Sequence, residues 1–131
     1  MRYLLDTNAV IALLNNATSK TARRLRQEQP ADVAISAIVM HELFYGAFNS
    51  RRTVQNTALI DALQFSVLDF DKEDARQAGM IRAVLAAKGT PIGAYDVLIA
   101  GQALERNLIL VTHNSREFGR VPGLRVEDWQ A

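Results

Sequence analysis

The amino-acid sequence predicts an α/β protein with a mostly parallel sheet, and three observations support this fold class. Short apolar runs without polar alternation recur along the chain, as expected of strands buried on both faces of a parallel sheet. Longer segments between these runs carry apolar residues at helical spacing. Such alternation is typical of βαβ units. The length of 131 residues predicts one domain, residues 1–131.

Five segments are predicted to form strands. The first, Tyr3–Leu5, ends abruptly at Asp6, and Thr7 or Asn8 is the predicted cap of the next helix. The remaining predicted strands are residues 33–35, 65–70, 108–111 and 124–126. The run at 108–111 leads directly into the polar residues 112–114, so polar side chains follow two of the strands.

Cap and stop signals bound the predicted helices. One helix is expected over residues 20–29, ended by Pro30, and Ser36 is the expected N-cap of an apolar helix from residue 37. Further helices are expected over residues 53–63, 72–87 and 94–106, with Gly89 closing the second of these. Acids in a first turn complement the helix dipole, so we assign three of them to capping: Asp71, Glu73 and Asp74.

Composition narrows the class of protein. Hydrophobic residues make up 49% and charged residues 22%, as in ordinary globular proteins, and the net charge of +1 favours no particular partner. The absence of cysteine excludes disulfides, thiolate metal sites and a cysteine nucleophile, and is consistent with a cytoplasmic protein. The apolar runs are too short for a membrane span, and Asp6 interrupts the first of them, so we expect no signal peptide.

Four polar residues stand at predicted strand ends or in the first two turns of helices: Asp6, Glu42, Asp96 and Asn114. Each carboxylate has a simpler explanation when considered alone. Asp6 could be only a helix cap, and Asp96 could be favoured by the helix dipole. Glu42 could be exposed or paired with Arg51 or Arg52, although a carboxylate in a mostly apolar helix needs some explanation.

Taken together, the same residues indicate a metal site. Right-handed crossovers in a parallel sheet bring these positions to one edge. Converging carboxylates repel one another unless a cation neutralises them, and Mg²⁺ or Mn²⁺ is the simplest cation with oxygen ligands. Such a site supports hydrolysis of phosphodiester bonds.

Four sequence blocks occur in a specific order and spacing, followed by PGLRVEDW at 122–129. The blocks are LLDTN at 4–8, Ser36 followed by Glu42 and Leu43, IGAYDVLIAGQA at 92–103, and VTHNSREF at 111–118. They resemble the PIN-domain ribonucleases and, more narrowly, the VapC toxins of bacterial type II toxin–antitoxin pairs. The similarity spans nearly the whole chain.

The resemblance implies a three-layer α/β/α sandwich around a five-stranded parallel sheet. It also implies a Mg²⁺-dependent endoribonuclease toxin that cuts RNA, in this subgroup the anticodon loop of tRNA, and thereby inhibits translation. Asp6, Glu42 and Asp96 would bind the metal, with Mn²⁺ as a substitute. Asn114 matches a fourth acidic position of the family, and because an amide is a poorer ligand we expect it to hold a water or the substrate phosphate.

Several neighbours are expected to support these residues. Thr7, Asn8, Ser36 and Thr112 would orient the carboxylates. Arg116 and Arg120 lie beside the predicted site, where they could contact RNA phosphate, and we expect Glu117 to balance their charge.

The resemblance further implies protein partners. One is a VapB-like antitoxin whose C-terminal segment would place a basic side chain among the carboxylates and displace the metal. The other is a second copy of the chain, because a homodimer through residues 45–63 would use Phe48, Val54, Leu59 and Leu63. Both interactions together would give a toxin–antitoxin hetero-oligomer.

One alternative function remains open, namely a catalytically inactive PIN-like domain that binds RNA or a protein partner. A haloacid dehalogenase-type phosphatase is disfavoured, because it would need a second Asp where the sequence has Asn8. A receiver domain would have no use for Glu42 together with Asp96. His41 is disfavoured as a catalytic residue because neighbours on a helix face apart, and His113 is disfavoured as a general base.

Overall fold

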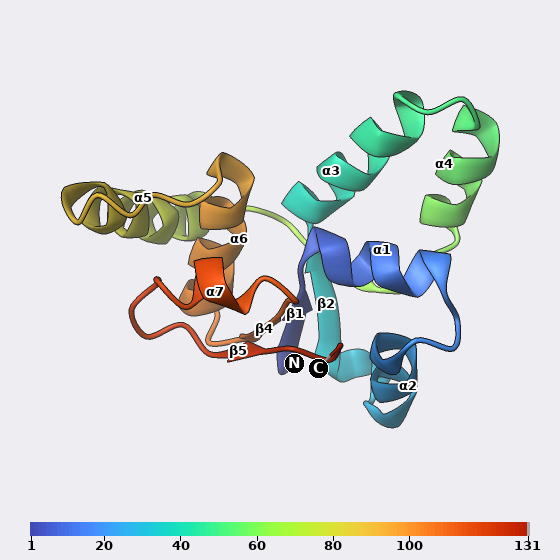
Figure 1. Cartoon of the computed structure of the whole chain (residues 1–131), viewed down its shortest axis with the longest axis horizontal. Coiled ribbons are helices and arrows are strands. Elements are labelled where there is room, and N and C mark those ends of the chain that lie inside the picture. Colours follow the sequence, from blue (N-terminus) through green and yellow to red (C-terminus); the bar gives the residue numbers. More distant parts are fainter. Residues whose placement is uncertain (131) are drawn as a thin grey trace.

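The computed structural model describes residues 1–130, which fold around one five-stranded sheet (Figure 1). The strands are β1 (Tyr3–Leu5), β2 (Val33–Ser36), β3 (Ser66–Leu68), β4 (Ile109–Val111) and β5 (Val126–Glu127). Their order in the sheet is β3-β2-β1-β4-β5, and every neighbouring pair is parallel. The predicted fold class is therefore confirmed.

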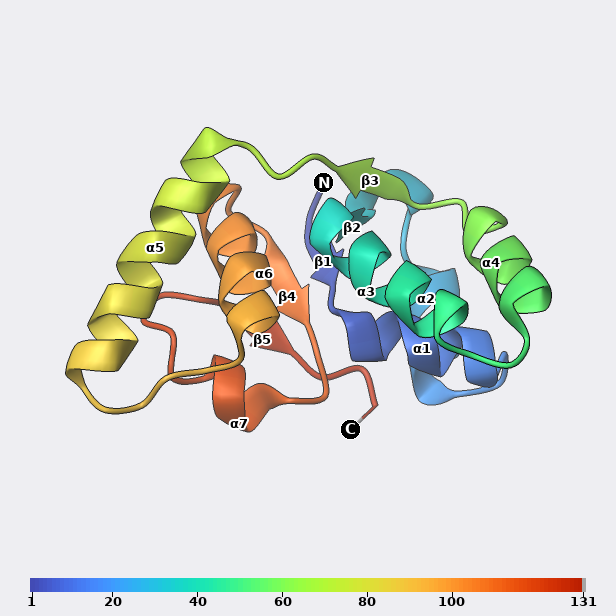
Figure 2. The same cartoon turned by 90° about the horizontal axis from the view of Figure 1, so that it is seen from above.

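Helices flank the sheet on both sides, with α1 to α4 on one side and α5 to α7 on the other (Figures 1 and 2). Their bounds are α1 (Thr7–Asn15), α2 (Lys20–Gln27), α3 (Ala37–Phe48), α4 (Thr53–Asp61), α5 (Lys72–Ala87), α6 (Ala94–Glu105) and α7 (Ser115–Phe118), and a 3₁₀ turn, η1 (Pro30–Asp32), precedes β2. The chain runs from β1 outward to β3 and then crosses back to β4. Right-handed crossovers place the helices of these two halves on opposite faces.

The reversal of strand order leaves a crevice at the carboxyl ends of β1 and β4, which is where open α/β sheets bind ligands. Both central strands are well buried, and Tyr3, Leu4 and Leu5 are at most 1% exposed. The backbone N–H of Asp6 donates to the carbonyl of Val111 (3.0 Å), which fixes the end of β1 against the end of β4. The crevice therefore has a rigid floor.

On the other face, α6 packs closely against α5. A Cβ atom at Gly101 would lie 2.6 Å from the Cα of Ala78, so only a glycine allows this approach of the two helices.

Several predicted boundaries were wrong by a few residues. Asp6, rather than Thr7 or Asn8, is the N-cap of α1. The second helix ends at Gln27 instead of residue 29, because the residue before a proline is held extended. The fourth helix ends at Asp61 rather than 63, β3 covers only 66–68 of the predicted 65–70, and the last strand is 126–127 rather than 124–126.

The cap of α3 and the acidic start of α5 follow the prediction. Ser36 Oγ accepts from the N–H of Ile38 (3.0 Å), and Asp71 and Asp74 form a reciprocal capping box. Among residues 1–130, no helix combines the length and the apolar composition that a membrane crossing requires.

Candidate functional site

The three predicted carboxylates meet at the crevice above β1 and β4. Asp6 follows β1 directly, Glu42 lies in the second turn of α3, and Asp96 lies in the first turn of α6. Glu42 and Asp6 both raise the pKa of Asp96 through charge repulsion, so the three side chains are close enough to influence one another. A fourth acid, Glu117 of α7, also belongs to this group, and we call Asp6, Glu42, Asp96 and Glu117 the acidic cluster.

Asp6 is the most buried member of the cluster, with only 4% of its surface exposed. Its Oδ1 accepts from the N–H of Ala9 (2.8 Å), which caps α1 and fixes the carboxylate. Burial raises the pKa of Asp6, and Glu42 raises it further, while hydrogen bonds from Thr112 and Ala9 act in the opposite direction. Asp6 can therefore both cap α1 and serve in the site, because only one of its two carboxylate oxygens, Oδ1, accepts the capping hydrogen bond.

Glu42 is half-buried, and its Oε1 accepts a hydrogen bond from the hydroxyl of Thr7 (2.8 Å). This contact joins the start of α1 to the second turn of α3. The alternative that Glu42 is a freely exposed side chain is therefore wrong. The hydroxyl of Thr7 thus contacts one of the predicted metal ligands directly.

Asp96 and Glu117 form the other half of the cluster. Burial raises the pKa of Asp96 to about 6, with further contributions from Glu117, Glu42 and Asp6. Glu117 Oε1 accepts from the N–H of Gly93 (2.7 Å), and this hydrogen bond, with others from Asn114 and Asp96, lowers the pKa of Glu117. A hydrogen bond between the two carboxyl groups contributes to both shifts, because it raises the pKa of Asp96 and lowers the pKa of Glu117.

From the sequence, Glu117 was expected to balance the charge of Arg116 and Arg120. In the structure it also binds Asn114 in the acidic cluster. Asn114, the predicted fourth site residue, donates from its amide to Glu117 Oε2 (2.5 Å), while its own N–H donates to Thr112 Oγ1 (2.9 Å). The two residues are three positions apart in a short helical turn. That spacing was the signal that could have placed Glu117 beside Asn114.

The other predicted residues lie around the cluster with different exposure. Thr112 and Ser36 are buried, whereas Asn8 and Arg116 are exposed on the turns that carry the cluster. His113 is exposed, and its Nδ1 lies 3.0 Å from Asp128 Oδ2. His41 is also exposed, and its ring packs against Tyr95.

The donor chemistry of the cluster fits a hard divalent cation. Its carboxylate oxygens are the ligands that Mg²⁺ and Mn²⁺ prefer, and their mutual repulsion is the cost that a cation would remove. Within residues 1–130, however, no three His, Asp or Glu side chains already stand in the arrangement of a metal site.

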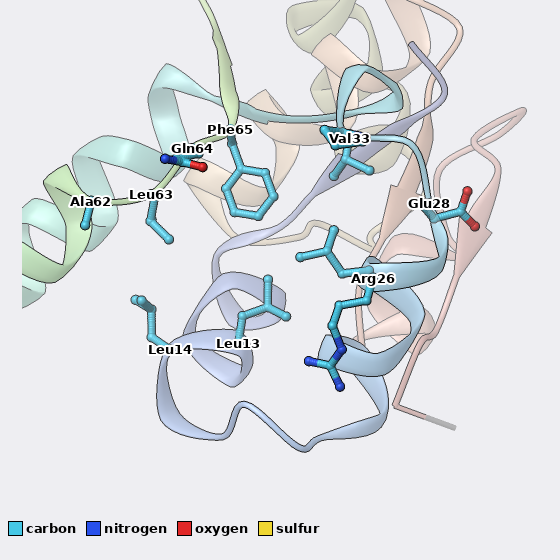
Figure 3. A pocket seen from close by; sticks show the side chains of 11 residues that line it. Leu13, Leu14, Arg26, Glu28, Val33, Ala62, Leu63, Gln64 and Phe65 are labelled. Atoms are coloured by element: carbon cyan, nitrogen blue, oxygen red, sulfur yellow. The ribbon is translucent and has the colours of Figure 1, made fainter.

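An apolar hollow of about 550 Å³ lies elsewhere, beside α1 and α2 (Figure 3). Leu13, Leu14 and Phe65 point into it, and no member of the acidic cluster lines it. The polar residues of its otherwise apolar lining are Arg26, Glu28 and Gln64, which bring no converging carboxylates together, so the candidate catalytic site is the acidic cluster and not this hollow.

Comparison with known proteins agrees with this geometry. Residues 3–124 match the family model described as "PIN domain". The chain is 42% identical to the tRNA(fMet)-specific endonuclease VapC of Salmonella typhimurium and 37% identical to ribonuclease VapC2 of Haemophilus influenzae, over 98% of each chain in both cases. The crystal structure of DNA-bound VapBC from Salmonella typhimurium superposes with a TM-score of 0.94 at 42% identity, covering 98% of both chains. The chain therefore belongs to the PIN-domain family and, within it, to the VapC ribonuclease toxins of VapBC toxin–antitoxin systems.

Proposed function

We propose that this VapC ribonuclease depends on Mg²⁺, with Mn²⁺ as a substitute, and that Asp6, Glu42 and Asp96 hold the ion. The acidic cluster carries this proposal, because the pKa of Asp96 is raised to about 6 by burial and by three neighbouring carboxylates. When bound, such an ion makes water more nucleophilic and neutralises charge that builds on the phosphate.

The residues of this chain would prepare the site in specific ways. Thr7 fixes Glu42, and Thr112 with the N–H of Ala9 fixes Asp6. Asn114 and the N–H of Gly93 fix Glu117 beside Asp96. Asn114 would therefore act mainly through Glu117, although one face of its amide remains suited to a water or a substrate phosphate. Because these supports are in place before substrate arrives, little reorganisation is needed during the reaction.

For the substrate we propose the anticodon loop of a tRNA, with initiator tRNA as the first candidate. The Salmonella relative is a tRNA(fMet)-specific endonuclease at 42% identity. The exposed Arg116 of α7 would contact backbone phosphate beside the cluster. Cleavage of an essential tRNA in the cytoplasm would inhibit translation.

We further propose a VapB-like antitoxin as the partner, since the Salmonella structure is a VapBC complex. A basic antitoxin side chain would be attracted by the acidic cluster and would compete with the metal. A homodimer through α3 and α4 is the second assembly proposed. The apolar residues available to this interface include Tyr45, Phe48 and Val54, which are 66%, 67% and 78% exposed. Leu63, which was also expected to contribute, is partly buried against the core.

The decisive experiment measures cleavage by the purified, antitoxin-free protein. We expect initiator tRNA to be cut with Mg²⁺ or Mn²⁺, and not in excess chelator. Asp96→Asn should abolish cutting while circular dichroism stays unchanged. Cleavage by the wild-type protein in excess chelator would overturn the metal-dependent mechanism, and equal cutting of elongator tRNAs would overturn the choice of substrate.

The proposed dimer is tested by sedimentation. Phe48→Glu should shift the free protein toward the monomer, because it buries a charge in the apolar contact between the two copies. Met80→Glu, which changes another exposed apolar residue, on α5, should leave the assembly unchanged. A Phe48→Glu protein that sediments as the wild type does would argue against this interface.

A further inference from the structure

Two aromatic side chains meet beside the acidic cluster, one from each of two helices. The rings of His41 in α3 and Tyr95 in α6 have centroids 5.2 Å apart and planes tilted by 50°. His41 is exposed, and Tyr95 keeps 47% of its surface exposed, so the contact leaves much of both rings open to solvent.

The position of this pair relates it directly to the site. His41 precedes Glu42 and Tyr95 precedes Asp96, and Glu42 and Asp96 are close enough for charge repulsion between them to raise the pKa of Asp96. Helices α3 and α6 contact each other, and the two rings are one point of this contact. The His41–Tyr95 pair therefore spans the same two helices as two carboxylates of the cluster, on the solvent side.

The pair has little role in holding the fold together. Neither ring belongs to the buried core, and both lie at the surface, so the fold does not depend on burying them. The expectation that His41 faces away from the site was based on the divergence of neighbouring residues on a helix. That divergence is consistent with the structure, because it turns the His41 ring outward to the rim, where it meets Tyr95.

We propose that the His41–Tyr95 pair is a docking surface for a single unstacked nucleobase next to the phosphate that is cut; this inference rests on the proposed ribonuclease function. Proteins recognise single-stranded RNA loops by stacking splayed bases on aromatic side chains and histidine. The planes of the two rings are tilted by 50°, so they present aromatic faces in two directions, and a base can stack flat on one of them. Stacking tolerates any base, so the pair supplies affinity and position rather than sequence choice.

The two sides of the acidic cluster differ in charge, as expected if one side contacts phosphate and the other contacts a base. Arg116 is exposed on α7, which also carries Glu117, and the exposed Arg120 follows just after this helix, so cations that suit phosphate stand on this side of the cluster. The rim formed by α3 and α6 offers rings instead. A strand of RNA that lays its backbone along α7 would present a base to the other rim.

The test compares three variants with the wild-type protein. Tyr95→Phe keeps a ring, Tyr95→Leu removes it, and Met80→Ala serves as a control for an exposed apolar residue far from the site. The probe is a tRNA anticodon-loop oligonucleotide with 2-aminopurine in place of one loop base at a time, bound in excess chelator so that it stays intact. Cleavage of the unmodified loop is measured separately with Mg²⁺.

We expect the wild-type protein and Tyr95→Phe to quench 2-aminopurine at one loop position, as stacking does. Tyr95→Leu should lose the quenching and raise Kd and KM by about 5- to 100-fold, the range that one stacked base supports. Its kcat and its Mg²⁺ dependence should stay within about threefold of wild type, since a loss that acted only through a displaced Asp96 would change both. Met80→Ala should match the wild type.

The outcomes separate this inference from the proposed function. If the wild-type protein cleaves with Mg²⁺ and Tyr95→Leu has unchanged Kd and KM, the base-docking surface is overturned and the ribonuclease stands. If Tyr95→Phe is as impaired as Tyr95→Leu, the hydroxyl and not the ring is responsible, and stacking is overturned. If the wild-type protein neither binds nor cuts the loop, both proposals fail.

Discussion

The hydroxyl of Thr7 donates a 2.8 Å hydrogen bond to Glu42, 35 residues further along the chain. Thr7 is the first residue of α1, and Glu42 lies in the second turn of α3. Because Asp6 caps the same helix that Thr7 begins, this hydrogen bond ties Glu42 to the helix that carries the Asp6 carboxylate. One short sequence, Asp6 followed by Thr7, thus supplies a carboxylate and the group that positions a second one.

Removing this hydrogen bond should impair the site without unfolding the protein. We expect Thr7→Val, which keeps the shape but not the hydroxyl, to lower kcat/KM for RNA cleavage by about 10- to 100-fold, as loss of an orienting partner does in metal sites. Thr7→Ser should retain most of the activity, because it can donate to Glu42. Titrating Mg²⁺ in the assay shows whether the loss lies in metal affinity, and a fully active Thr7→Val would contradict the positioning role.

Gly93 should be sensitive to the smallest enlargement. A Cβ atom there would lie 2.9 Å from Asp96 Oδ2 and 3.7 Å from Glu117 Oε1, so Gly93→Ala must displace the Asp96 carboxylate. We expect cleavage to fall by at least about 10-fold, since small displacements of reacting groups are costly. Gly79→Ala is the matched control in α5, where nothing lies within 4 Å. It should leave cleavage unchanged and stabilise the fold by about 0.5–1 kcal/mol in urea denaturation.

Asp96 makes the metal-free protein less stable at neutral pH. Its pKa is raised from 3.8 to about 6, so the ionised form destabilises the folded state above pH 6, and protonation relieves this penalty as the pH falls. In excess chelator at pH 7.5, Asp96→Asn should therefore be more stable than the wild type by about 1–2 kcal/mol, allowing for screening by solvent. The difference should shrink toward pH 4–5.

Mg²⁺ provides the control for this measurement. Added at pH 7.5, it should raise the melting temperature of the wild-type protein and have little effect on Asp96→Asn, because binding stabilises only the form that binds. An Asp96→Asn protein that is less stable than the wild type at pH 7.5 would show that the ionised Asp96 carboxylate does not destabilise the folded state.

Most of the fold and the three central acids could be predicted from sequence, for a physical reason. Buried strands of a parallel sheet appear in the sequence as continuous apolar runs. The residues after Leu5 and Val111 therefore mark the carboxyl ends of two strands directly. Asp6, Glu42 and Asp96 then follow from the rule that parallel strands end on one side. The element boundaries were less certain, because the competing end residues, such as Gln27 and Gln29, differ little in local preference.

Contacts between distant side chains were not predictable in the same way. Glu117 sits between two arginines in the sequence, which favoured a surface role, and only the turn of α7 directs it to Asp96 and the N–H of Gly93. The meeting of His41 with Tyr95 depends on how α3 and α6 cross. Asp74 was correctly assigned to capping, yet its complete burial beside Arg106 depends on the packing of α5 against α6.

Arg106 should therefore be important for stability, although it lies far from the acidic cluster along α6. Its Nη2 donates to Asp74 Oδ2 (2.9 Å) and its Nε to Asp74 Oδ1 (3.2 Å), while Gln102 also donates to Asp74 (3.0 Å). Burial alone would raise the pKa of Asp74, but these bonds and the N–H of Asp71 outweigh it, so the pKa is lowered. The ionised pair thus stabilises the fold above the ordinary pKa of an Asp, and this contribution is lost as the pH falls through the lowered value.

Arg106→Gln leaves the Asp74 carboxylate buried without its cation, which should cost about 3 kcal/mol in the free energy of unfolding at pH 7. Urea denaturation measures this cost, and Arg82→Gln, an exposed arginine on α5, is the control expected to stay within about 0.5 kcal/mol of wild type. The difference between the two variants should narrow as the pH is lowered toward 3, because protonated Asp74 no longer needs the arginine. Equal loss of stability in both variants would mean that the Asp74–Arg106 pair contributes no more than a surface contact.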